Sequence, residues 1–143
     1  MSSINWNRVI LGGLLAGVVI NVFESVLNSV VLTKDWEAAM AALGKPPIGG
    51  NQIGVFLVWG FLVGVFAVWL YAAIRPRYGA GPKTALCAGV AVWGLGYLQA
   101  SVAPIVLKLF PARMMVIGLM VGLVEVLAGT LLGAWLYREQ GTA

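Results

Sequence analysis

Four long apolar stretches alternate with short polar segments along the chain. Each stretch is close to the roughly 20 residues that an α-helix needs to cross a hydrocarbon core about 30 Å thick. A membrane β-barrel would instead alternate polar and apolar residues over strands of about 10 residues, and this chain has no such alternation. The pattern predicts an all-α, integral-membrane four-helix bundle that forms a single domain over residues 1–143, with spans at residues 8–32, 52–74, 83–107 and 113–137.

The longest polar connection lies between the first two apolar stretches and carries a further helix signal. Asp35 can cap a short helix that has Trp36 and Leu43 on one face, and Gly44 ends it. This predicts an interfacial helix over residues 35–44, lying in the outer surface of the membrane. Two interpretations are open. The helix either anchors the loop, which we favour, or forms a lid over an outward-facing cavity.

Composition agrees with a membrane protein. Hydrophobic residues make up 61% of the chain and charged residues 10%, whereas soluble domains have about 45–50% and about 25%. The protein is therefore expected to have the lipid bilayer as its surroundings, as a multi-pass membrane protein.

The basic residues indicate the orientation of the helices rather than a nucleic-acid partner. Lys and Arg together number nine, and they are spread over short loops instead of forming a patch. Arg75, Arg77 and Lys83 are the tightest group, and positively charged loops favour the cytoplasm. This predicts that the loop containing them, and with it both the N and C termini, lies on the cytoplasmic side.

Glycine is the clearest packing signal within the apolar stretches. The chain has 19 glycines, and many recur every four residues along one face of an expected helix. Small residues let helix backbones approach each other in lipid, where association depends on packing and hydrogen bonds. The residues expected at helix contacts are Gly13, Gly17, Gly60, Gly64, Gly89, Gly96, Gly118, Gly122, Gly129 and Gly133.

Two carboxylates lie within the apolar stretches, Glu24 in the first and Glu125 in the fourth. A charged acid near the centre of a membrane costs about 2.5–3.5 kcal/mol on insertion scales, so each should face protein or water. With a rise of about 1.5 Å per residue, Glu125 falls near the midplane and Glu24 about 6 Å towards the outer side. The candidate intramembrane polar site comprises Asn21, Glu24, Asn28, Gln99 and Glu125.

Such a cluster has two interpretations, and the sequence leaves both open. It can bind a proton or a cation, because a carboxyl group shielded from water and close to a second carboxylate holds its proton more readily. It can also be structural, because a protonated Glu that is hydrogen-bonded to Asn or Gln on another helix stabilises a membrane bundle.

Catalytic and cofactor chemistry have little support in the sequence. The chain has no histidine, so Cys87 and the serines lack the usual base, and no glycine-rich phosphate loop with its lysine is present. Histidine is also the commonest ligand for transition metals. We therefore expect a non-enzymatic protein with no metal and no other cofactor.

Three segments carry a resemblance to a known group of proteins: residues 4–6 (Ile-Asn-Trp), residues 34–40 (Lys-Asp-Trp-Glu-Ala-Ala-Met) and residues 91–97 (Ala-Val-Trp-Gly-Leu-Gly-Tyr). The chain resembles small four-helix bacterial inner-membrane proteins that are grouped as a domain of unknown function. The resemblance implies a four-helix fold in a bacterial inner membrane, and it implies no activity.

These observations lead to two functional hypotheses. The first is a protein that acts through helix packing, either as a homo-oligomer or as an accessory subunit of a larger membrane complex. The alternative is a proton- or cation-coupled small transporter or channel that uses Glu24 and Glu125. The two differ in whether the carboxylates exchange protons and whether a wet cavity lies between the helices.

Overall fold

The computed structural model describes residues 3–139, and every regular element in that range is helical. Two of the elements, η1 and η2, are single π-helical turns that continue a neighbouring α-helix. In chain order the elements are α1 (Trp6–Val26), η1 (Leu27–Val31), α2 (Thr33–Ala42), α3 (Gly50–Tyr78), α4 (Pro82–Trp93), η2 (Gly94–Leu98), α5 (Gln99–Val106) and α6 (Ala112–Leu136).

Four continuous helices are long and apolar enough to cross a membrane, which confirms the predicted all-α class and the number of long helices. They cover Trp6–Val31, Gly50–Tyr78, Pro82–Val106 and Ala112–Leu136. The second helix continues past its expected end at residue 74 and includes Pro76. It ends at Gly79, whose φ of 85° is readily accessible only to glycine. The basic segment expected to be a loop is thus largely helical.

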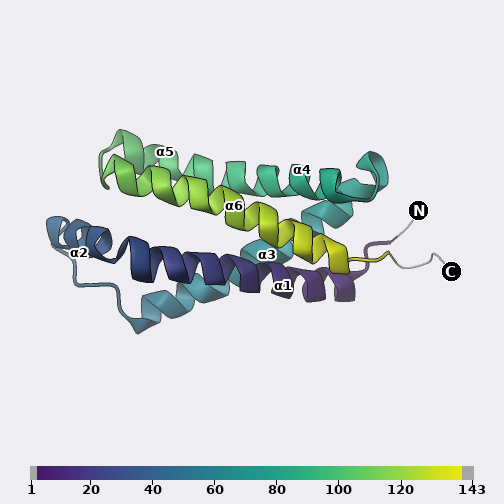
Figure 1. Cartoon of the computed structure of the whole chain (residues 1–143), viewed down its shortest axis with the longest axis horizontal. Coiled ribbons are helices and arrows are strands. Elements are labelled where there is room, and N and C mark those ends of the chain that lie inside the picture. The colour runs from purple at the N-terminus through teal and green to yellow at the C-terminus, as the bar shows by residue number, and fades with distance from the viewer. Residues whose placement is uncertain (1–2, 140–143) are drawn as a thin grey trace.

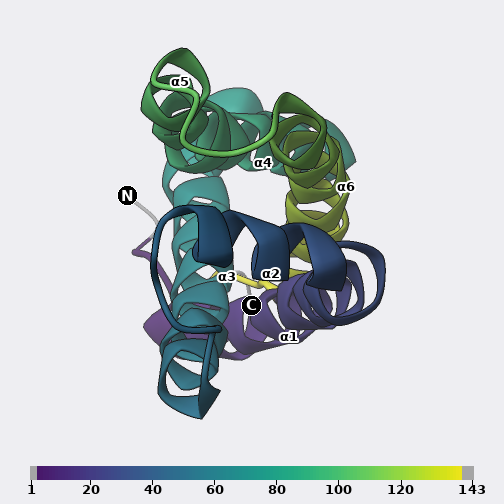
Figure 2. The same cartoon turned by 90° about the vertical axis from the view of Figure 1, so that its left-hand side faces the viewer.

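The four long helices form a bundle in which α1 and α4 lie on opposite sides. Helix α1 packs against α3 and α6, and α4 packs against the same two helices from the other side. The end-on view in Figure 2 shows this arrangement, with α2 lying across one end of the bundle. Figure 1 shows that α1 begins and α6 finishes at the opposite end. We call these the α2 end and the terminal end.

Glycines produce a close contact between α1 and α3. A Cβ atom on Gly64 would lie 2.5 Å from the carbonyl oxygen of Gly13 and 2.8 Å from Cα of Gly17. A Cβ atom on Gly17 would in turn lie 2.7 Å from Cα of Phe61. Because these neighbours are backbone atoms, they cannot rotate away, and the two helices require glycine here.

Helix α6 has its own glycine contacts, with α1, α4 and η2. Gly133 meets the backbone of Gly12, Gly129 meets that of Ala16, and Gly89 on α4 faces Leu127. Two of the expected packing glycines behave differently, because Gly96 and Gly118 have open space where a side chain would be. The expectation that these two lie at helix contacts was wrong. The pattern of four-residue spacing contains Gly118, but α6 diverges from α1 towards the α2 end, as Figure 1 shows.

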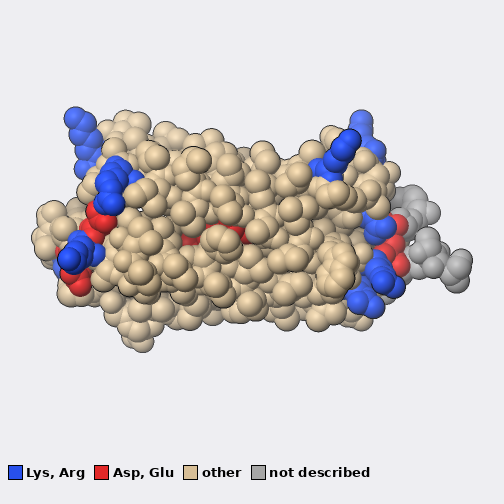
Figure 3. Space-filling view, viewed as in Figure 1, with Lys and Arg blue, Asp and Glu red and all other residues tan. Residues whose placement is uncertain are grey.

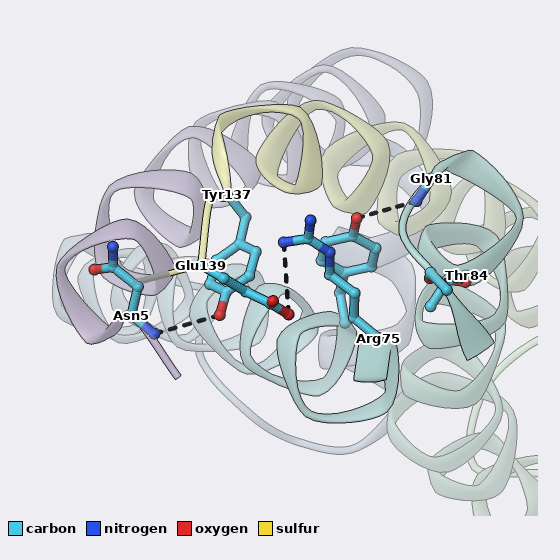
Figure 4. A network of polar contacts seen from close by, with 8 residues as sticks. Asn5, Arg75, Gly81, Thr84, Tyr137 and Glu139 are labelled. Carbon is cyan, nitrogen blue, oxygen red and sulfur yellow. Dashed lines mark hydrogen bonds and ion pairs between the residues drawn. The ribbon is translucent and has the colours of Figure 1, made fainter. Parts of the chain in front are cut away.

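Charged residues gather at the two ends of the bundle. Figure 3 shows Lys and Arg at both ends of a long uncharged middle, with acidic atoms visible at its centre. At the terminal end the guanidinium of Arg75 lies over the ring of Tyr137, 5.5 Å from its centroid, and 3.7 Å from Oε1 of Glu139 (Figure 4). The Tyr137 hydroxyl accepts a hydrogen bond from the backbone N–H of Asn5. These contacts join the start of α1, the end of α3 and the segment after α6.

Helix α2 lies where the sequence predicts a short helix, although it covers Thr33–Ala42 rather than residues 35–44. Asp35 makes an ion pair with Arg113 at the start of α6, with 3.1 Å between Nη1 and Oδ1. The ring of Trp36 packs edge-on against Phe110, 5.7 Å between centroids. Helix α2 is therefore held to the α5–α6 connection across the end of the bundle.

Candidate functional site

An open cavity of about 610 Å³ lies in the α2 half of the bundle. Its walls come from α1, η1, α2, the loop after α2, the first half of α3, and η2. Phe56 and Trp59 on the α3 side are 61% and 64% exposed, so this wall is open to the surroundings of the bundle. The volume falls in the range of about 300–1,000 Å³ that is usual for small-molecule sites.

Glu24 forms part of the cavity wall and is tied to α2 through Asn28. The Asn28 side-chain amide donates from Nδ2 to Oε2 of Glu24 at 2.6 Å, and its Oδ1 accepts from the indole Nε1 of Trp36 at 2.7 Å. Both ends of the amide are thus used, and the two bonds fix its orientation. The chain of contacts connects a carboxylate on α1 with the helix that lies across the end of the bundle.

Glu125 lies in the interior beside this wall and is fully buried. Its Oε1 accepts a hydrogen bond of 2.8 Å from the hydroxyl of Tyr97. Gly122, one turn earlier on α6, provides the space for the tyrosine ring, because a Cβ atom there would lie 2.5 Å from Cδ1 of Tyr97. Gly122 was expected to bring two helix backbones together, and in the structure it accommodates an aromatic side chain.

The two carboxyl groups interact with each other. Glu24 and Glu125 lie close enough for a side-chain hydrogen bond when one of the two carries a proton. The second oxygen of Glu125, Oε2, has no donor among the described side chains and backbone groups. A buried acceptor without a partner is costly, and a proton held between the two acids would satisfy it.

The other two residues of the predicted polar site have different positions. Asn21 is buried and lines the cavity, but its amide donates to the carbonyl oxygen of Leu57 at 3.0 Å, so it joins α1 to α3. Gly60 provides the space for that amide. Gln99 begins α5, is exposed and is not among the residues that line the cavity. The structure therefore brings together four of the five residues, and Gln99 is not among them.

Tyr97 and Trp36 donate hydrogen bonds within the site, to Glu125 and Asn28, and the sequence analysis did not include them in it. Both depend on a π-helical turn: Tyr97 belongs to η2, and Trp36 reaches Asn28, which belongs to η1. A π-turn adds a residue to the helix and rotates the residues after it by about 100°, so α-helical spacing no longer predicts the facing side. The one feature of the sequence that could have indicated them is the residue type, since both side chains combine an aromatic ring with a hydrogen-bond donor.

Comparison of the chain with protein-family models, with curated proteins and with solved structures gives no match. The resemblance to a four-helix family of unknown function stays a prediction. Function must therefore be inferred from the geometry of the cavity and its two acids.

Proposed function

We propose that this protein is a small membrane carrier that binds a small molecule in the cavity beside α2 and exchanges it for a proton held by Glu24 and Glu125. The observation that carries the proposal is the position of the two acids. Glu24 reaches the cavity, and behind it lies a buried partner, Glu125, which has one oxygen without a donor among the described residues.

The chemistry of this arrangement favours proton exchange over a purely structural role. A structural pair would be most stable with every lone pair satisfied and water excluded. Here one acid faces a cavity of about 610 Å³, where its proton can leave or a ligand can approach. Intramembrane carboxylates that face a cavity are typical of ion and proton pathways.

The test is proton movement in reconstituted vesicles that contain a pH-sensitive dye. A pH gradient is imposed, and cationic, neutral and anionic organic solutes are added in turn. We expect at least one class to dissipate the gradient with the wild-type protein, and Glu24→Gln to abolish the effect because the substitution keeps the shape and removes the titratable proton. Gln99→Leu, outside the cavity, is the control that should retain the effect. If no class changes the gradient, the carrier function is wrong.

A second candidate is a packing role, as a homo-oligomer or as an accessory subunit of a larger complex. The observation that favours it is the first half of α3, where every residue from 51 to 59 is exposed. A partner helix on this face would close the cavity wall. The mass of the purified complex in detergent distinguishes the two, because a carrier that acts alone gives the mass of one chain, and a packing role gives a larger one.

We further propose that the protein lies in a bacterial inner membrane and that its terminal end faces the cytoplasm, with α2 on the outer side. Arg8 near the start of α1, Arg75 and Arg77 near the end of α3 and Lys83 at the start of α4 lie at the terminal end, where positively charged segments favour the cytoplasm. Single cysteines placed in a Cys87→Ala background should react with an impermeant reagent from outside intact cells at residue 37 and not at residue 78. The opposite labelling pattern would reverse the orientation.

A further inference from the structure

We propose that the ligand of the cavity is a hydrophobic organic cation, bound with its positive charge at Glu24. The inference rests on the proposed function, because it names the class of molecule that the carrier would exchange for a proton. Three features of the cavity lead to it: the sign of its charge, the character of its walls and the set of oxygen atoms that it offers.

The charge of the cavity is negative. Glu24 and Glu37 are the acidic residues of its lining, and in the described part of the chain no Lys or Arg contributes to the walls. In a setting of low dielectric an anion near Glu24 would be repelled and a cation attracted much more strongly than in water. Cations are therefore favoured over anions as ligands.

The walls of the cavity are apolar and rich in aromatic rings. Trp36, Phe56, Trp59 and Tyr97 line it, together with aliphatic side chains of α1 and α3 such as Ile20 and Ile53. Aromatic faces attract organic cations, and indole does so best. The apolar walls also gain free energy by burying hydrocarbon, which a neutral or cationic organic molecule supplies.

The same walls are unsuited to a bare metal ion. A hard cation needs about six oxygen ligands to replace its water. Among residues 3–139 no group of three or more His, Cys, Asp or Glu is placed to hold a metal ion. The side-chain oxygen of Asn28, the amide beside Glu24, already accepts a hydrogen bond from Trp36, and the side-chain oxygen of Asn21 lies against Gly60 of α3. An organic cation keeps its charge shielded within its own substituents and has no such requirement.

The route into the cavity agrees with an amphiphilic ligand. The opening lies along the first half of α3, where Phe56 and Trp59 are exposed. This opening faces the side of the bundle, which is lipid if the four long helices cross a membrane. A hydrophobic cation concentrates in the bilayer and can enter there, whereas a strongly hydrated solute cannot.

The test uses two probes of the same four-ring shape and opposite charge, tetraphenylphosphonium and tetraphenylborate. Equilibrium binding to the purified full chain in detergent is measured with each. We expect saturable binding of the phosphonium and at least tenfold weaker binding of the borate. Glu24→Gln should weaken phosphonium binding at least tenfold, and Trp59→Leu should also weaken it. Gln99→Leu and Trp135→Leu, both outside the cavity, should leave it unchanged.

The wild-type comparison needs no variant, so it remains decisive if a substitution prevents folding. Equal binding of the two probes, tighter binding of the borate, no binding of either, or phosphonium binding that Glu24→Gln leaves unaltered would each overturn the inference. Failure of the proposed function is distinguishable. Charge-selective binding without proton movement in vesicles would refute the proton exchange and leave the ligand class standing. Proton movement driven only by neutral or anionic solutes would refute the ligand class and leave the carrier function standing.

Discussion

The two halves of the bundle are packed differently. In the terminal half, α1, α3 and α6 meet through glycine backbones such as Gly12 with Gly133, and a Tyr71–Tyr137 pair fills the space near the end. In the α2 half, α3 diverges and leaves a cavity of about 610 Å³ between the helices. The comparison supports different roles for the two halves, in which the terminal half stabilises the fold and the α2 half has space for a ligand.

The two π-turns also differ between the halves, because both lie in the same one. Both η1 and η2 lie in the α2 half and contribute Asn28 and Tyr97 to the cavity lining. A π-turn is less stable than an α-helical turn and is often retained at functional sites. Both π-turns therefore lie in the half of the bundle that contains the cavity.

The largest effect should come from adding volume in the packed half. Gly64→Leu places a side chain against the backbone of Gly13 and Gly17, which cannot move without separating α1 from α3. We expect a loss of about 3 kcal/mol in unfolding free energy, the upper end of the usual cost of overpacking, measured by thermal or denaturant unfolding in detergent. Gly118→Leu is the matched control, because its side chain would enter open space. Similar losses in both variants would contradict the proposed difference between the halves.

An intermediate effect is expected at the buried acid. Tyr97→Phe removes the hydroxyl that donates to Oε1 of Glu125 and leaves that oxygen buried without its partner. The expected cost is about 1–3 kcal/mol of stability. Tyr78→Phe serves as the control, because the Tyr78 side chain is exposed. If Tyr97→Phe has no greater effect than the control, the hydrogen bond does not stabilise Glu125.

The smallest effect should concern the attachment of α2. Trp36→Phe keeps an aromatic ring beside Phe110 and removes the indole N–H that donates to Asn28. The loss should be about 0.5–1.5 kcal/mol, seen as faster hydrogen exchange of the α2 amides with little change in global unfolding. Trp135→Phe, at an exposed position of α6, should change neither. Slower or unchanged exchange in α2 would show that this hydrogen bond does not attach the helix. A large fall in global stability would show that α2 is part of the core.

The difference between the halves also explains how much the sequence could predict. The packed half follows regular α-helical spacing, so Gly13, Gly17 and Gly64 were expected at contacts and lie there. The sequence allowed Glu24 and Glu125 to be predicted as possible neighbours, because both acids are costly in an apolar stretch and fall at similar depths, and in the structure they do lie close together. Helix order decides such a meeting, and spacing along one helix contains no information about its neighbours.

The open half was predicted less well because its geometry departs from the α-helix. Gln99 follows η2 directly, and the extra residue of that turn rotates it away from the position that α-helical spacing gives. Trp36 was expected at the membrane surface, and its hydrogen bond to Asn28 depends on how η1 and α2 meet at Leu32. No local pattern in the sequence signals either π-turn.

The central claim is that Glu24 and Glu125 hold a proton that can be reached from the cavity, and carbodiimide labelling tests it most directly. Dicyclohexylcarbodiimide is hydrophobic and forms stable adducts with protonated carboxyl groups that are sheltered from water. After treatment of the protein in membranes, peptide mass spectrometry should find the adduct at Glu24, the acid in the cavity wall. Asp35, paired with Arg113, and the exposed Glu37 should remain unmodified. Absence of any adduct at Glu24 and Glu125, in protein shown to be folded, would contradict the account.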